Sequence, residues 1–198
     1  MKNIKNKIKF MAAAAVVGTT FSGCSLDMLP LNEVVLENFW TDKSDVESVV
    51  NSCYIAMQEG GYITSLIVWG ENRSDNTAPN TDASNDLRYL MKGNLKVTNS
   101  YCNWAAFYNV INRCNTVLYY AAQVAQEDPN YTESDYRITQ AEVKFMRAYS
   151  YLTLIKTFKD VPFSLEPSID DNIDFRLPRT SFATIINALI DDIEGCKD

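Results

Sequence analysis

Paired carboxylates are the residues in this sequence that could do chemistry. Asp170-Asp171 and Asp191-Asp192 are adjacent acids, whereas hydrolysis of a glycoside needs two carboxyl groups about 5 to 9 Å apart, one with a raised pKa in a cleft. Adjacent acids near apolar helices are more simply explained as solvated faces. The chain contains no histidine, which removes the commonest general base and most catalytic zinc sites. We therefore expect no catalytic residues and no enzymatic activity.

A long polar segment, 70–86, is the place to look for ligand contacts, because it has almost no apolar side chains. Loops of this length in compact domains are usually functional or disordered, and a solvated excursion is the alternative. Asp75, Asp82 and Asp86 could offer oxygen ligands to calcium, but their spacing does not match an EF-hand and no glutamate closes the loop. The seven glycines form neither GxGxxG nor a Walker loop. We expect no metal and no cofactor.

The charge of the chain argues against nucleic acid as a partner. The formal net charge is −7, and four of the 18 basic residues lie in the first 23 positions, which contain no Asp or Glu. The remainder therefore carries 14 basic against 25 acidic residues, a net charge of −11. A body of that sign repels phosphate backbones and anionic lipid headgroups. Any membrane anchor must be hydrophobic.

The N-terminus has the composition of an export signal. Residues 1–9 carry the four lysines, and residues 10–21 carry no charge, a run too short for a bilayer, which needs ~20 residues, but suited to the apolar region of a signal peptide. Phe21-Ser22-Gly23-Cys24 resembles the lipobox of bacterial lipoproteins. We expect residues 1–23 to be a lipoprotein signal peptide, Cys24 to be lipidated and 24–41 to form the lipidated tether. An ordinary cleaved signal, with Cys24 left as a thiol, is the alternative.

Apolar residues that recur every three or four positions predict four amphipathic helices. Ser44-Asp45-Val46-Glu47 has the form of a capping box before the first helix, and Gly60-Gly61 marks its end. Val161-Pro162 ends the third. The helices are expected at about 45–59, 101–126, from 133 to just before Val161, and 182–193. The starts of the four helices show no clean 34-residue repeat. The pattern therefore predicts an all-α helical array but does not identify its repeat family.

The third predicted helix is apolar over most of its circumference. One stripe consists of Ile138, Ala141, Phe145, Ala148, Leu152 and Ile155, and another of Val143, Met146, Leu154 and Phe158. The wetter side is expected to hold only Gln140, Lys144, Arg147 and Tyr151. Such a helix is packed on two sides, as in stacked layers of helices.

Four cysteines remain besides Cys24, so disulfides are conceivable in an exported chain: Cys53, Cys102, Cys114 and Cys196. If 101–126 is one helix, Cys102 and Cys114 are about 18 Å apart along its axis at ~1.5 Å per residue and cannot bond. We expect buried free thiols in preference to a disulfide framework.

Three blocks of sequence go beyond this helical pattern. The first runs from Cys24 through Leu26-Asp27 and Glu37-Asn38-Phe39-Trp40 to Asp45 and Tyr54; the second contains Trp104, Tyr108, Ile111, Asn112, Arg113 and Asn115. The third is AEVKFMRAYSYL at 141–152, followed by TFKDVPF at 157–163. Together they resemble the N-terminal part of the SusD/RagB family of outer-membrane nutrient-uptake lipoproteins, with its RAYxY helix closing on FGDVP.

The resemblance implies a fold and a role. The fold is a SusD-like array of helix pairs similar to tetratricopeptide repeats, and residues 42–198 would be its N-terminal helical domain, incomplete because full-length members are more than twice as long. The role is that of an outward-facing lipoprotein of the outer membrane. It would bind an oligosaccharide or other nutrient over a TonB-dependent transporter similar to SusC, which is binding and not catalysis.

The family's ligand face is built from loops, so the resemblance and the polar segment together indicate loop residues as ligand contacts: Arg73, Asp75, Asn76, Arg88 and Tyr89. By contrast, the aromatic residues at helical spacing, Trp104, Tyr108, Tyr149 and Tyr151, are expected in the core or at helix interfaces. Arg147 is expected to be a paired structural cation. Lys159 stands where the family has glycine, which would serve as a left-handed helix cap, so that lysine costs ~1 kcal/mol unless the turn differs.

Another class of function fits the same sequence. A lipid-anchored periplasmic scaffold of helical repeats would bind a protein partner and no nutrient. The residues directly after Cys24 contain no strong acidic run of the kind expected in some surface-export signals, so outward display is less well supported than lipidation.

Overall fold

The computed structural model describes residues 39–169 and 176–197. The chain divides into two compact units, Met1–Phe39 and Trp40–Asp198, and the description below concerns the second unit. The expected signal peptide (1–23), Cys24 and all of the expected tether before residue 39 lie outside the described residues. The helices are α2 (Lys43–Gln58), α3 (Gly60–Trp69), α4 (Asn85–Met91), α5 (Ala105–Glu127), α6 (Glu133–Phe158) and α7 (Phe182–Glu194), with the short 3-10 helices η2 (Glu71–Arg73) and η3 (Ser100–Cys102).

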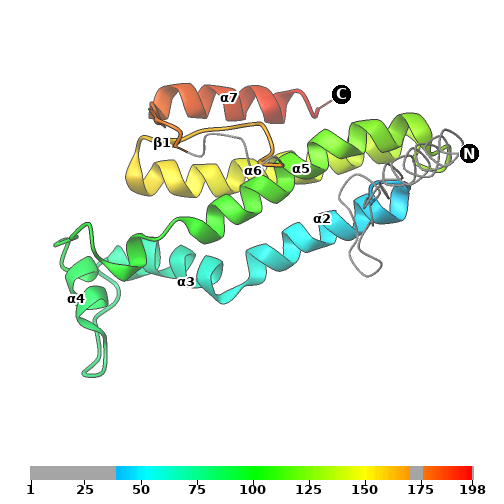
Figure 1. Ribbon diagram of the computed structural model, residues 1–198. Coiled ribbons are helices and arrows are strands. Elements are labelled where there is room, and N and C mark those ends of the chain that lie inside the picture. The colour runs from blue at the N-terminus through cyan, green and yellow to red at the C-terminus, as the bar shows by residue number, and fades with distance from the viewer. Residues whose placement is uncertain (1–38, 170–175, 198) are drawn as a thin grey trace, which may run out of the picture. The chain divides into compact units, whose positions relative to one another are not determined.

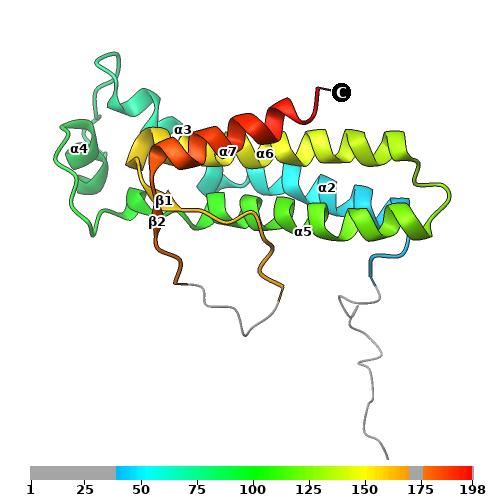
Figure 2. The ribbon, with the colours of Figure 1, turned by 90° about the horizontal axis from the view of Figure 1, so that it is seen from above.

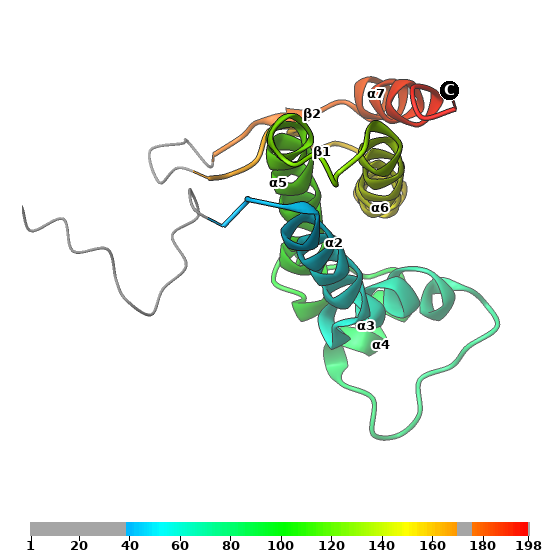
Figure 3. The same cartoon turned by 90° about the vertical axis from the view of Figure 1, so that its right-hand side faces the viewer.

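The long helices form the predicted all-α array. Viewed roughly along their axes in Figure 3, α2, α5 and α6 pack against one another, and α7 lies on the side of α6 that is farther from α2. Figure 2 shows that these helices run side by side over much of their length. The two strands, β1 (Val161–Pro162) and β2 (Arg179–Thr180), form an antiparallel pair that brings the chain back from α6 to the start of α7.

The start of α2 is stabilised by a capping box two residues earlier than the sequence predicts. The N-cap is Asp42, not Ser44: the Asp42 carboxylate accepts from the backbone N–H of Asp45, and the Asp45 carboxylate accepts from the backbone N–H of Asp42. Both partners are aspartates, and the Asp45 carboxylate also accepts the backbone N–H of Thr41 at 3.0 Å, which is the main cause that holds the pKa of Asp45 below its usual value. The sequence pattern therefore predicts the wrong polar residue as the N-cap of α2.

One further helix boundary differs from the prediction, and one helix is not predicted at all. α5 begins at Ala105 and not at 101, because Asn99 caps the separate 3-10 helix η3 and the Asn103 side chain accepts the backbone N–H of Ala105. Gly60-Gly61 follows the end of the first helix as predicted, since α2 ends at Gln58 and Glu59 is extended, but a further helix, α3, starts at Gly60. A Cβ placed on Gly61 would lie 3.6 Å from the Cβ of Ala106, so α3 passes close to the start of α5.

α6 buries only one of its two expected apolar stripes: Val143, Met146 and Leu154 are buried as predicted. Arg147 and Tyr151, predicted on the wetter side, are 3% and 0% exposed, whereas Ile138, Phe145 and Leu152 are 57%, 61% and 44% exposed. Polar partners explain the reversal: Nη1 of Arg147 donates to Asn115 and the hydroxyl of Tyr151 donates to the carbonyl of Ser164, although Nε of Arg147 has no partner among the described residues. The apolar stripe of Phe145 and Leu152 is left on the surface.

The ends of α6 and α7 agree with the sequence. Thr132 and Asp135 form the capping box of α6, and Ser181 caps α7 through the backbone N–H of Thr184. The four cysteines among the described residues are unbridged, as expected, although only Cys53 and Cys114 are fully buried.

The residue after α6, Lys159, has φ 63° and ψ −100°. Only glycine adopts this region without a steric penalty, and a side chain there costs of order 1 to 3 kcal/mol. We expect Lys159→Gly to raise the free energy of unfolding by about 1 kcal/mol, since the entropy that glycine loses on folding offsets part of the relief. The midpoint of thermal unfolding should rise by roughly 2 to 4 °C.

A matched control for this prediction is Lys156→Gly, which places glycine at an exposed position in the last turn of α6. Glycine inside a helix lowers stability by up to about 1 kcal/mol relative to alanine, so this variant should unfold at a lower temperature. A fall in the midpoint for Lys159→Gly as well would show that the turn is not strained.

Candidate functional site

The five residues predicted to contact ligand lie in or near α4, at one end of the array (Figure 1). Arg88 and Tyr89 belong to α4 itself and not to a loop, contrary to the prediction. Arg73, Asp75, Asn76 and Tyr89 are exposed. Arg88 is half-buried and donates to three backbone carbonyls, those of Asn80, Thr81 and Ala83, at 2.7, 2.8 and 3.0 Å. Arg88 thus stabilises the loop that precedes α4.

Three further contacts order this region. The Asp86 carboxylate accepts the backbone N–H of Ser100 at 2.9 Å, which lowers the pKa of Asp86, and the Asn99 side chain donates to the Asp86 carbonyl. The ammonium of Lys96 lies 5.1 Å from the centre of the Tyr89 ring. The loops at this end therefore present a charged and aromatic surface supported by their own hydrogen bonds.

The most buried charged group joins the second and third sequence blocks. Arg147 donates from Nη1 to Oδ1 of Asn115 at 2.7 Å, and its Nη2 forms an ion pair with Asp192 of α7. Lys144 lies 3.8 Å from the same carboxylate. Arg147 is therefore the paired structural cation that the sequence predicted, and it ties α5, α6 and α7 together.

The segment 161–168 is held along α5 by side chains of the same two blocks. The Tyr108 hydroxyl donates to the Pro162 carbonyl at 2.6 Å, and the Asn115 amide donates to the carbonyls of Ser164 and Glu166. Tyr151 from α6 donates to the carbonyl of Ser164 and accepts its backbone N–H, both at 3.0 Å. Burial raises the pKa of both tyrosines, so their hydroxyls stay protonated as donors.

A cavity of about 370 Å³ follows this segment. Its polar lining groups include Asn112, Asn115, Tyr108 and Tyr151, yet the bonds above already use many of their atoms, and Asn112 accepts the backbone N–H of Ser168. These motif residues therefore stabilise the fold through internal hydrogen bonds, and few of their polar groups remain available to a ligand. The prediction that Trp104, Tyr108 and Tyr151 are core or interface residues is confirmed, but Tyr149 is 39% exposed.

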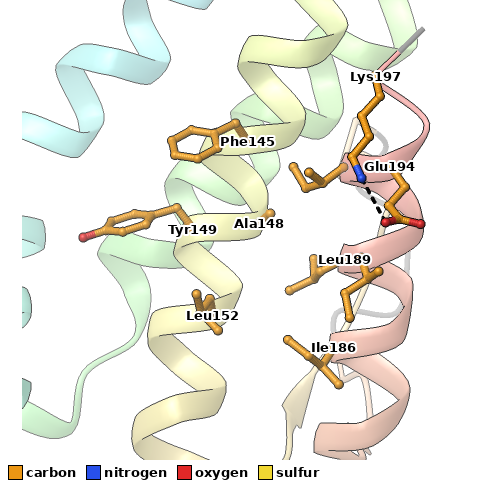
Figure 4. Close-up of a pocket in the computed structure, with 10 residues that line it drawn as sticks. Phe145, Ala148, Tyr149, Leu152, Ile186, Leu189, Glu194 and Lys197 are labelled. Atoms are coloured by element: carbon orange, nitrogen blue, oxygen red, sulfur yellow. Dashed lines mark hydrogen bonds and ion pairs between the residues drawn. The ribbon is translucent and has the colours of Figure 1, made fainter.

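An apolar groove of about 390 Å³ separates α6 from α7. Figure 4 shows Leu152, Leu189 and Ile186 between the two helices, whereas the rings of Phe145 and Tyr149 project from the side of α6 farther from α7. An ion pair of 3.0 Å between Glu194 and Lys197 closes one end. The lining is mostly apolar, with polar groups only on Tyr149, Glu194 and Lys197, and it suits an apolar partner.

Within the ranges 39–169 and 176–197, no helix has the length and apolar character needed to cross a membrane. The same part of the chain contains no cluster of three or more cysteine or acidic side chains arranged to hold a metal ion.

Comparison with known proteins assigns the family. A family profile described as SusD-like, "Starch-binding associating with outer membrane", matches residues 26–198. The chain belongs to the SusD-like family. The resemblance in its sequence blocks is thereby confirmed, and its all-α, tetratricopeptide-like array is the SusD-like fold.

Individual SusD-like relatives are longer than this chain. SusD-like protein P38 of Formosa agariphila is 25% identical over 200 residues, covering 100% of this chain and 38% of the relative, and P25 of the same organism is 27% identical, covering 80% and 31%. Among solved structures, a SusD superfamily protein of Bacteroides vulgatus has a TM-score of 0.67 at 25% identity over 80% of this chain and 34% of its own. NanU of B. fragilis has a TM-score of 0.68 at 19% identity, covering 86% and 33%, and shares the fold.

Proposed function

We propose that this SusD-like chain is a surface-exposed lipoprotein of the outer membrane that binds a glycan or similar nutrient and delivers it to a SusC-like TonB-dependent transporter. The observation that carries the proposal is the family match over residues 26–198, because the family is described as starch-binding and associated with the outer membrane. The lipobox-like residues before Cys24 support anchoring by acyl chains, which hold a protein durably when several act together.

The proposed role is binding without catalysis. The chain has no histidine, and the carboxylate of Asp192, one of the adjacent acids, is engaged by Arg147 and Lys144. Helix α4 and the segment before it present exposed groups of the kind that recognises sugar hydroxyls, namely the ring of Tyr89 and the side chains of Arg73, Asp75 and Asn76. These residues and Arg88 remain the proposed ligand contacts.

Anchoring is tested with Cys24→Ala. We expect complete loss of a metabolically incorporated fatty-acid probe and loss of the protein from the outer-membrane fraction, because the acylated thiol is absent. Cys102→Ser serves as the control, since Cys102 lies in η3 and is only half-buried; it should keep both the label and the location. Unlabelled wild-type protein would refute the anchor.

Partnership and orientation need intact cells. We expect the protein to co-purify with a TonB-dependent transporter from detergent-solubilised outer membranes and to be cleaved by protease added to whole cells. Recovery without any such transporter, together with no glycan binding, would contradict the proposal.

The apolar groove between α6 and α7 favours the second candidate, a lipid-anchored periplasmic scaffold that binds a protein partner. Groove residues such as Ile190, 48% exposed, are unusual on a surface that serves glycan binding alone. Protection from external protease in intact cells, with cleavage after the outer membrane is opened, would favour this candidate.

A further inference from the structure

A polar groove lies between α2 and the first half of α6, toward the end of the array opposite α4 (Figure 1). Its volume is about 380 Å³. Helix α2 provides Lys43, Glu47, Asn51 and Tyr54, α6 provides Asp135, Thr139 and Glu142, and the connection between α5 and α6 provides Tyr131. Neither the loops around α4 nor the contacts of segment 161–168 use this groove.

The hydroxyl of Tyr131 is the most unusual group in the groove. Tyr131 is 2% exposed, and its hydroxyl makes no hydrogen bond within the described part of the chain. Burial raises the pKa of Tyr131, so its hydroxyl stays protonated. Buried polar groups are nearly always paired, so this phenol is a donor in need of an acceptor.

The ring of Tyr54 supplies a flat apolar surface at the mouth of the groove. Tyr54 is 42% exposed, and Glu142 is near enough to add to the effect of burial in raising the Tyr54 pKa. An accessible aromatic ring flanked by a carboxylate and the Asn51 amide can stack on the apolar face of a sugar while accepting its hydroxyls.

The charge of the groove selects against anions. Lys43 is its one cation among the lining residues, and it is already paired, at 2.9 Å with Asp135 and at 3.8 Å with Glu47. Three carboxylates, those of Glu47, Asp135 and Glu142, therefore line the groove with one ammonium, and the carboxylate of Glu142 lies near Tyr54. A sulfated or uronic-acid glycan would be repelled.

We propose that this groove binds a neutral saccharide, with Tyr54 as the stacking platform, Glu142 and Asn51 as acceptors for sugar hydroxyls, and Tyr131 as a buried donor. The inference rests on the proposed function, because it takes glycan binding as given. It adds a second subsite far along the array from the loop residues and specifies the charge class of its ligand.

The test is isothermal titration of the purified protein with maltoheptaose, cellohexaose, xylohexaose and mannohexaose, and with oligogalacturonate as the anionic probe. For the neutral sugar that binds, Tyr54→Ala should weaken affinity about tenfold. Tyr131→Phe should weaken it roughly three- to tenfold, with an unchanged or higher unfolding midpoint, because the lost hydroxyl has no partner in the free protein. Tyr119→Ala, an exposed tyrosine of α5 outside the groove, should bind as wild type.

The outcomes separate this site from the loops around α4. If Tyr54→Ala and Tyr131→Phe both bind as wild type while Tyr89→Ala weakens binding, the groove is not a saccharide site and the proposed function survives. If the wild-type protein binds oligogalacturonate but none of the four neutral sugars, the groove proposal is overturned and the proposed function survives. Tighter binding of oligogalacturonate than of any neutral sugar would overturn the charge argument.

Discussion

Replacing Asp192 with alanine should lower the free energy of unfolding by about 3 kcal/mol. The Arg147 side chain is only 4% exposed and the Asp192 side chain 15%, so the substitution leaves a buried guanidinium without its counter-ion and beside Lys144. Removal of one partner from a buried ion pair typically costs about 3 to 5 kcal/mol, far more than the pair contributes at a surface. Urea unfolding followed by circular dichroism at 222 nm measures the change.

The adjacent residue supplies a matched control. Asp191 is exposed and forms no ion pair among the described residues, so Asp191→Ala should change stability by less than about 0.5 kcal/mol. Equal effects of the two substitutions would mean that Arg147 does not depend on Asp192. In that case the junction of α5, α6 and α7 would have to be stabilised by the remaining bond to Asn115.

Phe107→Ala should cost about 4 kcal/mol, within the usual range of about 3 to 5 kcal/mol for a buried phenylalanine. The ring is 0% exposed and stacks on Tyr62 and Trp69, with centroid distances of 4.2 and 4.9 Å. Its removal leaves a cavity where α3 meets α5, because the neighbouring rings cannot close the space without losing their own contacts. Near-ultraviolet circular dichroism should also weaken, since three aromatic side chains lose a fixed environment.

The same substitution at an exposed site separates burial from side-chain identity. Phe145 is 61% exposed on α6, so Phe145→Ala should alter stability by no more than about 0.5 kcal/mol. A large loss there would show that this apolar surface is covered in the folded protein, and a small loss at Phe107 would contradict the packing of α3 on α5.

Local signals determined which elements the sequence could predict. α6 and α7 begin where Thr132 and Ser181 cap them, and both signals are contained in a few adjacent residues. The sequence does not predict α3, because the helix starts with two glycines and lacks a polar face, so its apolar residues show no helical periodicity. Propensity and periodicity fail in such a segment, where packing of Tyr62 and Trp69 against Phe107 decides the structure.

The sequence was less informative about which side chains contact which. The pairing of Arg147 with Asp192 joins residues 45 positions apart, and helical periodicity alone placed Arg147 on the solvent side. The groove of Tyr54 and Tyr131 was also missed, because its walls come from helices that only the fold brings together. An isolated tyrosine between two helices carries no signal in a sequence that has 11 of them.

The central claim, that this SusD-like protein captures glycans, is tested most directly by applying the purified, folded protein to an array of neutral and anionic oligosaccharides. We predict saturable binding to at least one neutral glycan, reduced when Tyr89 or Tyr54 is replaced by alanine. Signal no higher than background across the array, from protein whose circular dichroism is that of a folded all-α chain, would contradict the account.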